Sequence, residues 1–177
     1  MARRVRVYQQ GDLDGLCGVY AIVNALRYLL RLNRKQCQTL FATLVRTLSQ
    51  ARPHPYDPLV QGVVFRQLRQ LVTEADHCCS LHQGLSFQAR RLRLRGEDRT
   101  LRRLWAILDQ AIRPGCVAII GITGRTDHWC VVYRITPKTL RLLDSFGRSC
   151  IRRSRCTVRS ARTRYCLELG EILLIER

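Results

Sequence analysis

The order in which two hydrophobic patterns appear is the feature that most constrains how this chain can fold. Up to the pair Pro114-Gly115, apolar residues recur mainly at the three- and four-residue spacing of helices. After that pair, short apolar runs separated by turn residues are typical of strands. Helices first and strands later favour an α+β fold, in which a helical part packs on an antiparallel sheet, over a doubly wound parallel sheet.

Four helices and four strands are expected along the chain. The first helix buries one stripe, because Val19, Ile22, Leu26 and Leu29 recur on one face. In the last strand, Gly170 marks a bulge or bend. The expected helices cover residues 16–32, 36–48, 58–73 and 98–112, and the expected strands cover 116–122, 128–135, 139–144 and 165–175.

The length of the chain fits one domain, which we predict over residues 1–177. With 46% apolar residues, a chain of this size can bury a substantial core. Polar residues follow the basic first residues where a signal peptide needs an apolar region. No stretch approaches the ~18 consecutive apolar residues of a membrane span. We therefore expect a cytoplasmic protein without membrane contact, and export without a cleavable signal stays open.

A cysteine stands in a glycine-flanked turn where the first expected helix begins. Unpaired N–H groups and the positive end of the helix dipole stabilise a thiolate at such a position, which makes Cys17 a candidate nucleophile. The small neighbours Gly15 and Gly18 would let a substrate backbone approach. Asp12 and Asp14 would oppose thiolate formation if they pointed inward, so we expect them to face solvent or cap the turn. Taken alone, the cysteine could equally be a small buried residue.

Two residues of the strand region supply the side chains that such a thiol needs. His128 can take the thiol proton and return it to a leaving group. The carboxylate of Asp144 can accept a hydrogen bond from the second ring nitrogen and orient the imidazole. An antiparallel meander places the start of one strand beside the end of the next, so we expect His128 near Asp144. Asp127 is a rival, but side chains alternate along a strand and turn it to the opposite face.

These motifs resemble the papain-like cysteine peptidase superfamily, and most closely its small bacterial members that are similar to peptidases processing bacteriocin leader sequences. The resemblance rests on Gln-Gly-Asp-Leu-Asp-Gly-Leu-Cys-Gly with the helix after it, on His-Trp-Cys-Val-Val-Tyr and on Leu-Leu-Asp-Ser-Phe-Gly, and spans roughly residues 8 to 147 in outline. It implies a papain-like fold with the nucleophile at a helix N-terminus. It also implies that Cys17 is the nucleophile, His128 the general base and Asp144 the orienting acid.

A glutamine ahead of the cysteine donates to the oxyanion in this family. Here Gln10 and Gln9 lie seven and eight residues before Cys17. The resemblance implies this role for Gln10, with Gln9 as the alternative. Asn24 on the first helix could bond to the loop that holds Gln10, but a capping or solvated side chain is commoner. The aromatic residues nearest the motifs are Trp129, Tyr20 and Phe146, for which core packing is the commoner role.

The resemblance implies a thiol-dependent hydrolase that cleaves a peptide or amide bond of a peptide or protein substrate through a thioester. A first alternative is a protein glutamine deamidase or transglutaminase, acting as an effector or toxin on the same fold, because the same thiolate can attack a glutamine side chain. A second alternative is a non-catalytic basic module that binds nucleic acid or an acidic protein. No cofactor is expected.

The net charge of +18 is the basis of that second alternative. Such a charge attracts phosphates or an acidic protein, for example an immunity partner. Only two of the 31 basic residues are lysine, so codon composition alone could explain the arginine excess. Few aromatic residues stand between the arginines, and we expect nucleic acid to bind only non-specifically. Two blocks concentrate the charge, namely Arg90, Arg91, Arg93, Arg95, Arg99, Arg102 and Arg103, and then Arg148, Arg152, Arg153, Arg155, Arg159, Arg162 and Arg164.

The nine cysteines show no regular disulfide spacing, and their number is odd. Without a secretory signal, we expect mostly reduced thiols. Cys37, Cys116 and Cys130 fall in apolar segments and are expected in the core. The stretch His77-Cys78-Cys79-Ser80-Leu81-His82 gathers imidazoles and thiols but fits no familiar zinc spacing. We therefore predict a loop there and no metal.

Overall fold

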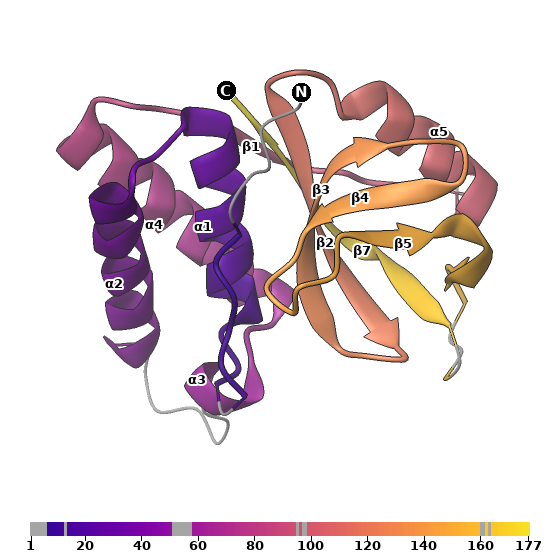
Figure 1. Ribbon diagram of the computed structural model, residues 1–177, viewed down its shortest axis with the longest axis horizontal. Helices are drawn as coiled ribbons and strands as arrows, with labels where there is room; N and C mark the ends of the chain where they lie inside the picture. Colours follow the sequence, from indigo (N-terminus) through magenta and orange to yellow (C-terminus); the bar gives the residue numbers. More distant parts are fainter. Residues whose placement is uncertain are drawn as a thin grey trace.

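A computed structural model describes residues 7–12, 14–50, 58–94, 96, 99–159, 162 and 164–177. Helices from the first half of the chain pack on one face of an antiparallel sheet, and a single helix covers the other face (Figure 1). This is the α+β arrangement expected from the sequence. Each helix of the described part is too short or too polar to span a bilayer.

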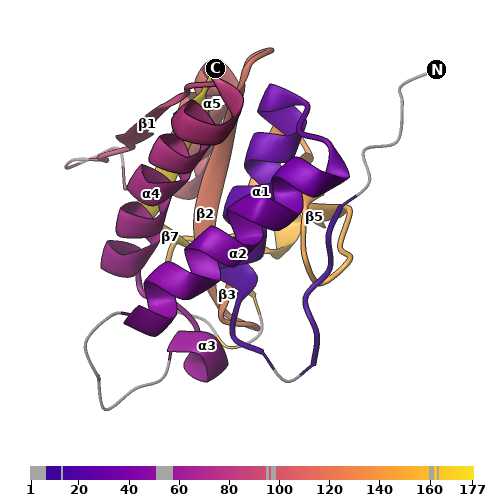
Figure 2. The same ribbon diagram turned by 90° about the vertical axis from the view of Figure 1, so that its left-hand side faces the viewer.

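The helices lie in two groups on either side of the sheet. On one side, α1, α2 and α4 lie next to one another (Figure 2). On the other side lies α5. The helices are α1 (Cys17–Leu30), α2 (Arg34–Gln50), the short α3 (Pro58–Gln61), α4 (Phe65–Gln83) and α5 (Leu101–Ala111).

The sheet has the strand order β1-β7-β2-β3-β4-β5, and β6 pairs with β7 outside this path. Neighbours pair antiparallel except β6 and β7, which are parallel. The meander from β2 to β4 is thus confirmed. The strands are β1 (Gln88–Arg91), β2 (Cys116–Gly124), β3 (His128–Ile135), β4 (Thr139–Leu143), β5 (Cys150–Arg152), β6 (Cys156–Thr157) and β7 (Tyr165–Glu176).

A bulge interrupts the pairing of β2 with β7. Ile120 lies opposite Ile172, whereas Ile122 lies opposite Leu167, so residues 168–171 of β7 face a single residue of β2. Gly170 is one of these bulged residues, as its position in the strand pattern predicts. Beyond the bulge, Tyr165 and Cys166 of β7 pair with β2 on one side and with β6 on the other.

The core is divided by the sheet. On the α1 side, Ile22 and Leu26 are 1% exposed and pack with sheet residues such as Val131. On the α5 side, Leu104 and Leu108 are fully buried against the other face. Because burying one such side chain contributes about 1.5–3 kcal/mol, the two clusters supply most of the drive for folding.

The helix expected over 58–73 differs in the structure. It is broken at Gly62, whose φ of +90° lies in the left-handed region that glycine favours. A new helix, α4, begins at Phe65 and runs on to Gln83. The expected helix over 98–112 is α5, which begins at Leu101, and position 98 lies outside the described residues.

The prediction of a loop over 77–82 is wrong, because α4 passes through these residues. Their buried positions continue the helical spacing of Leu71 and Ala75, which the mixture of thiols and imidazoles obscured. Cys78 and Cys79 face the core, whereas His77 and His82 are exposed. Among the described residues, no group of three or more potential metal ligands comes together. Burial also raises the pKa of Cys79 to about 12, so this thiol is unreactive.

Three short strands lie outside the expected set. Strand β1 is fully exposed along its length and belongs to an arginine block, so it has no apolar alternation. Strands β5 and β6 have three and two residues. Charged, short strands at the border of a sheet are a common protection against pairing with other chains, and they give little hydrophobic signal.

Candidate active site

Three side chains that are far apart in the sequence converge where α1, β3 and β4 meet. Strand β3 begins with His128, and Asp144 directly follows the end of β4. The register pairs Val131 with Leu143, which brings the start of β3 to the residues after β4. Nε2 of His128 forms a hydrogen bond with Oδ1 of Asp144, and both residues are buried. Asp127 is exposed, as expected for a residue on the other side of the strand.

The hydrogen bond to Asp144 fixes the form of the imidazole. A carboxylate only accepts hydrogen bonds, so Nε2 of His128 carries the proton and Nδ1 keeps a free lone pair in the neutral ring. Nδ1 is buried, and no hydrogen bond of regular geometry reaches it from the described residues. A buried nitrogen without a partner is costly in a purely structural histidine.

The thiol of Cys17 also affects the pKa of the His128 imidazole. Burial lowers the pKa of His128, but hydrogen bonding with Asp144 and then with Cys17, together with the charges of both, outweighs burial, and the pKa is raised above its ordinary value of 6.5. No hydrogen bond of regular geometry joins the thiol to Nδ1. Hydrogen bonds of catalytic pairs are often long or poorly aligned before a substrate binds.

Cys17 is the first residue of α1. The preceding residue Leu16 occupies the N-cap position, and its side chain forms no capping hydrogen bond. Leucine is among the poorest N-caps, because it lacks an acceptor for the N–H groups of the first turn. The positive end of the helix dipole therefore lies at Cys17 without a side-chain cap.

The turn before Cys17 is held by Asp14. Its Oδ1 accepts from the N–H of Leu16 at 3.0 Å, and its Oδ2 accepts from the N–H of Gly11 at 2.9 Å. Asp14 thus caps the turn, and Asp12 is exposed. Both positions agree with the expectation that neither carboxylate points at the thiol.

The two glycines beside Cys17 are required by packing. A Cβ on Gly15 would lie 2.3 Å from the backbone nitrogen of Gly62, and a Cβ on Gly18 would lie 2.3 Å from Cγ2 of Val63. The N–H of Gly15 also donates to the carbonyl of Leu59 at 2.7 Å. The space beside these glycines is therefore filled by the segment after α3, which positions the turn of Cys17.

Gln10 connects this turn to the other half of the site. Its Nε2 donates to the carbonyl oxygen of Asp14, and its backbone N–H donates to the carbonyl of Ser145 at 3.2 Å. The hydroxyl of Ser145 donates to its Oε1 at 3.4 Å. An amide nitrogen has two protons, so the bond to Asp14 occupies one of them. Gln9 is exposed, and its Nε2 lies 3.2 Å from where a Cβ on Gly147 would be.

Asn24 holds the segment that contains Gln10. It is buried in α1, its Oδ1 accepts from the N–H of Tyr8 at 2.8 Å, and its Nδ2 donates to the carbonyl of Tyr8 at 3.0 Å. The bond to the loop of Gln10, which was the less common alternative, is thus the one that forms.

An arginine and an aromatic ring complete the surroundings of the pair. Phe146 is 46% exposed and stacks on the ring of His128, so it covers the imidazole rather than filling the core. Nη1 of Arg148 lies 3.9 Å from Oδ2 of Asp144, and its guanidinium lies 5.3 Å from the centre of the Phe146 ring. Trp129 is buried instead, and its Nε1 donates to the carbonyl of Val63 at 2.8 Å. No family model and no curated protein matches this chain.

Proposed function

We propose that this protein is a thiol-dependent hydrolase of the cysteine peptidase type, with Cys17 as nucleophile, His128 as general base and Asp144 as the residue that orients the base. The observation that carries this proposal is the placement of His128 between a thiol at a helix N-terminus and a buried carboxylate. A buried histidine and aspartate are expensive to desolvate, so stability alone does not account for them.

The first step is the attack on the substrate. Nδ1 of His128 takes the proton of the Cys17 thiol, and the sulfur forms a bond to the carbonyl carbon while the π electrons move to the carbonyl oxygen. The negative oxygen is stabilised by N–H groups at the start of α1, where a side-chain cap is lacking. In this proposal the second Nε2 proton of Gln10 is a further donor.

The second step forms and then resolves a thioester. The carbon–nitrogen bond breaks, and the imidazolium of His128 gives its proton to the leaving amine. Water then attacks the thioester with His128 as the base, the carbon–sulfur bond breaks, and the carboxylic product leaves with the thiol restored. Throughout, Asp144 accepts the hydrogen bond from Nε2 and stabilises the charged imidazole.

A peptide-cleavage assay tests this proposal. A mixture of peptides of varied sequence is incubated with the wild type, with Cys17→Ala and with Cys150→Ser, and new peptide ends are identified by mass spectrometry. Cys150 is a suitable control because its thiol is half-buried and lies on β5, away from His128. We expect the wild type and Cys150→Ser to cleave the same peptides and Cys17→Ala to cleave none.

The same mass spectra distinguish hydrolysis of a peptide bond from deamidation of a glutamine side chain. Conversion of glutamine to glutamate without new ends, dependent on Cys17, would replace peptide cleavage by deamidation. Cleavage that persists in Cys17→Ala, or a thiol at position 17 that reacts no faster than that of Cys150, would overturn the thiol mechanism.

A further inference from the structure

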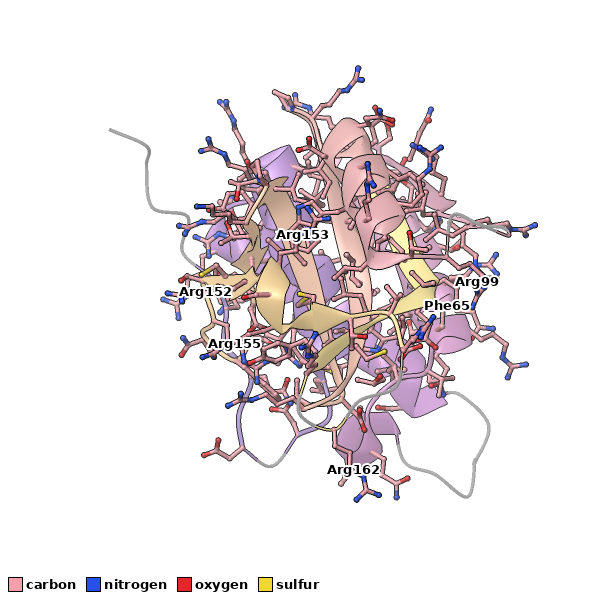
Figure 3. All side chains as sticks on the ribbon, turned by 90° about the vertical axis from the view of Figure 1, so that its right-hand side faces the viewer. Phe65, Arg99, Arg152, Arg153, Arg155 and Arg162 are labelled. Atoms are coloured by element: carbon pink, nitrogen blue, oxygen red, sulfur yellow. The ribbon has the colours of Figure 1, made fainter. Side chains whose placement is uncertain are left out.

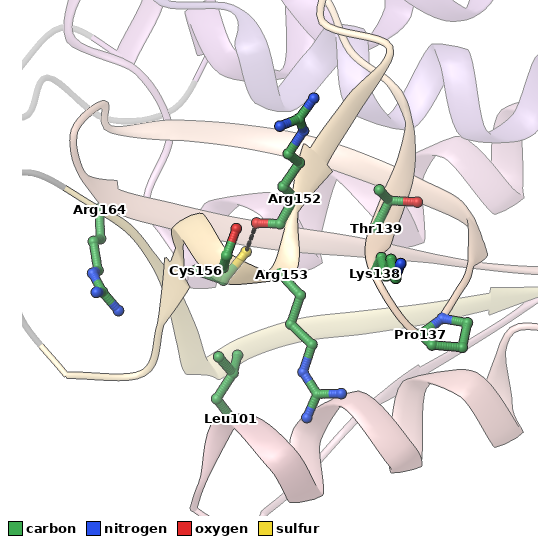
Figure 4. A pocket seen from close by; sticks show the side chains of 9 residues that line it. Leu101, Pro137, Lys138, Thr139, Arg152, Arg153, Cys156 and Arg164 are labelled. Atoms are coloured by element: carbon green, nitrogen blue, oxygen red, sulfur yellow. Dashed lines mark hydrogen bonds between the residues drawn. The ribbon is translucent and has the colours of Figure 1, made fainter.

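A cavity of about 790 Å³ opens on the α5 side of the sheet, away from the site described above (Figure 4). The turn between β3 and β4, strands β5 and β6, the 3₁₀ turn Arg153–Arg155 and the start of α5 surround it. Four of the residues that line it are basic, namely Lys138, Arg152, Arg153 and Arg164. Neither Cys17 nor His128 nor Asp144 lines this cavity, so an inference from it does not rest on the proposed function.

Among the described residues, the basic side chains of this cavity have no acidic partner. In the part of the chain that the structure describes, no carboxylate forms an ion pair with Lys138, Arg152, Arg153 or Arg164. The sequence also has no acidic residue between positions 145 and 167, which include β5, β6 and the turn between them. Positive charges that gather at one hollow without counter-charges create a local field that attracts anions.

One of the arginines is held in place. The guanidinium of Arg153 lies over the ring of Trp105, 5.3 Å from its centre, and the backbone N–H of Arg153 donates to the carbonyl of Lys138 at 2.8 Å. Trp105 is itself fixed, because it is buried and its Nε1 donates to the carbonyl of Thr136 at 2.8 Å. Such a guanidinium loses little freedom when it binds a ligand.

The remaining arginines have different orientations. Figure 4 shows the guanidiniums of Arg153 and Arg164 on either side of Leu101, whereas the guanidinium of Arg152 points away from Leu101. In Figure 3, Arg152, Arg153 and Arg155 lie near one another, whereas Arg99 and Arg162 lie elsewhere. Arg153 and Arg164 are therefore the pair best placed to contact the same ligand.

We propose that this cavity binds a phosphate-bearing ligand of nucleotide size, with Arg153 and Arg164 holding the phosphates. The planar forks of two arginines match phosphate oxygens with paired hydrogen bonds. The volume of the cavity lies within the range of cavities that hold small organic ligands, and it is far larger than the volume of a single phosphate ion. Leu101 and Pro137 supply apolar surface for the rest of the ligand.

The test measures binding of three probes to the full chain, namely ATP, inorganic tripolyphosphate and a short single-stranded RNA. The wild type is compared with Arg153→Gln/Arg164→Gln and with the control Arg34→Gln/Arg46→Gln, which removes the same charge from exposed positions on α2. We expect the first double variant to lose about tenfold or more in affinity, because paired charged hydrogen bonds are lost. The control is expected to bind almost as the wild type does.

Two further comparisons distinguish a specific binding site from general attraction by the positive charge of the protein. Arg153→Lys/Arg164→Lys keeps the charge and removes the forks, and we expect it to bind more weakly than the wild type and more tightly than the Gln variant. For the RNA probe, log K falls as log salt rises. Loss of two phosphate contacts makes this fall shallower, by about 1.4 in slope, in the Gln variant. Circular dichroism spectra and melting temperatures verify that each variant is folded.

The outcomes discriminate as follows. Binding of ATP or tripolyphosphate that depends on Arg153 and Arg164 supports a free phosphate-bearing ligand. Binding of RNA alone with the same dependence supports the same site, with the phosphates supplied by a nucleic acid backbone. Equal losses in the two Gln variants, or binding of none of the probes by the folded wild type, would overturn the proposal.

Discussion

The ring of Phe146 stacks on the imidazole of His128, with ring centroids 3.9 Å apart and 18° between the planes. Strand β4 ends at Leu143, and the turn that follows, closed by the N–H of Gly147 donating to the carbonyl of Asp144 at 3.0 Å, carries Phe146 over the imidazole. The phenyl ring covers a hydrogen bond between His128 and Asp144 that water would otherwise weaken.

Truncating this ring tests its contribution. We expect Phe146→Ala to lower the rate of peptide cleavage by about three- to tenfold, since aromatic pairs contribute about 0.5–1.5 kcal/mol. Phe146→Tyr keeps the stacked ring and is expected to retain most of the activity. A pH–rate profile that is identical in the wild type and Phe146→Ala would show that the ring does not act through the imidazole.

Alkylation of the thiols distinguishes Cys17 from the rest. We expect a limiting dose of iodoacetamide between pH 5 and 8 to label Cys17 first, because His128 can take its proton, whereas burial raises the pKa of Cys156 to about 12. Intact mass and peptide mapping give the site. His128→Ala should remove the preference, and Cys150→Ser should not. Labelling of Cys17 no faster than of Cys150 would contradict the thiol–imidazole pair.

The raised pKa of His128 predicts how stability depends on pH. Between the unfolded pKa and the raised folded pKa, the native state binds more protons than the unfolded state, so stability falls as pH rises. The contribution is fully present below the unfolded pKa and is lost as pH rises through the folded one. Urea titrations of the wild type and His128→Gln should therefore show a difference that shrinks from pH 6 to pH 9. If the difference in stability grew over this pH range, the pKa of His128 would not be raised in the folded state.

The link between Asn24 and Tyr8 predicts a loss of both stability and activity. Asn24→Ala leaves two backbone groups of Tyr8 without their partners, which costs about 1–3 kcal/mol, and it frees the segment of Gln10. Asn33→Ala is the control, because exposed Asn33 shares two hydrogen bonds with Gln36 at the start of α2. We expect urea denaturation to show a loss of stability in Asn24→Ala and in Asn33→Ala. In the cleavage assay, we expect only Asn24→Ala to lose activity.

The packing of Gly18 predicts that even one methyl group is harmful there. A Cβ would lie 2.3 Å from Val63, so Gly18→Ala should destabilise the fold by about 1–3 kcal/mol. Gly170→Ala is the control, because the nearest atom to its Cβ would be at an ordinary 3.6 Å. If thermal melts place the two variants at the same midpoint, the close contact at Gly18 does not constrain the turn.

The convergence of His128 with Asp144 could be predicted because it depends on local patterns. Apolar runs with clear turns between them set the bounds of β3, and consecutive strands pair in a meander. The placement of Cys17 at the first position of α1 follows from a glycine-rich turn before an apolar run. These features need only short-range information, so one sequence was sufficient.

Contacts that no local pattern marks could not be predicted in the same way. Arg148 lies beside Asp144, yet in the sequence it is one arginine among many. The break at Gly62 depends on how the chain packs against Gly15, because a glycine inside a helical pattern is often tolerated. Asn24 did carry a signal, since it is a polar residue within the apolar part of α1 and therefore needs a buried partner.

The place of β7 in the sheet has a consequence for synthesis. It is the last strand in chain order, but it lies between β1 and β2 rather than at a border. While a ribosome extends the chain, the edge of β2 stays open until residues 165–176 have emerged. Cys17 and His128 are therefore synthesised well before the sheet that they pack on is complete. Chains that stop before position 165 leave a long apolar edge, and we expect them to aggregate rather than act.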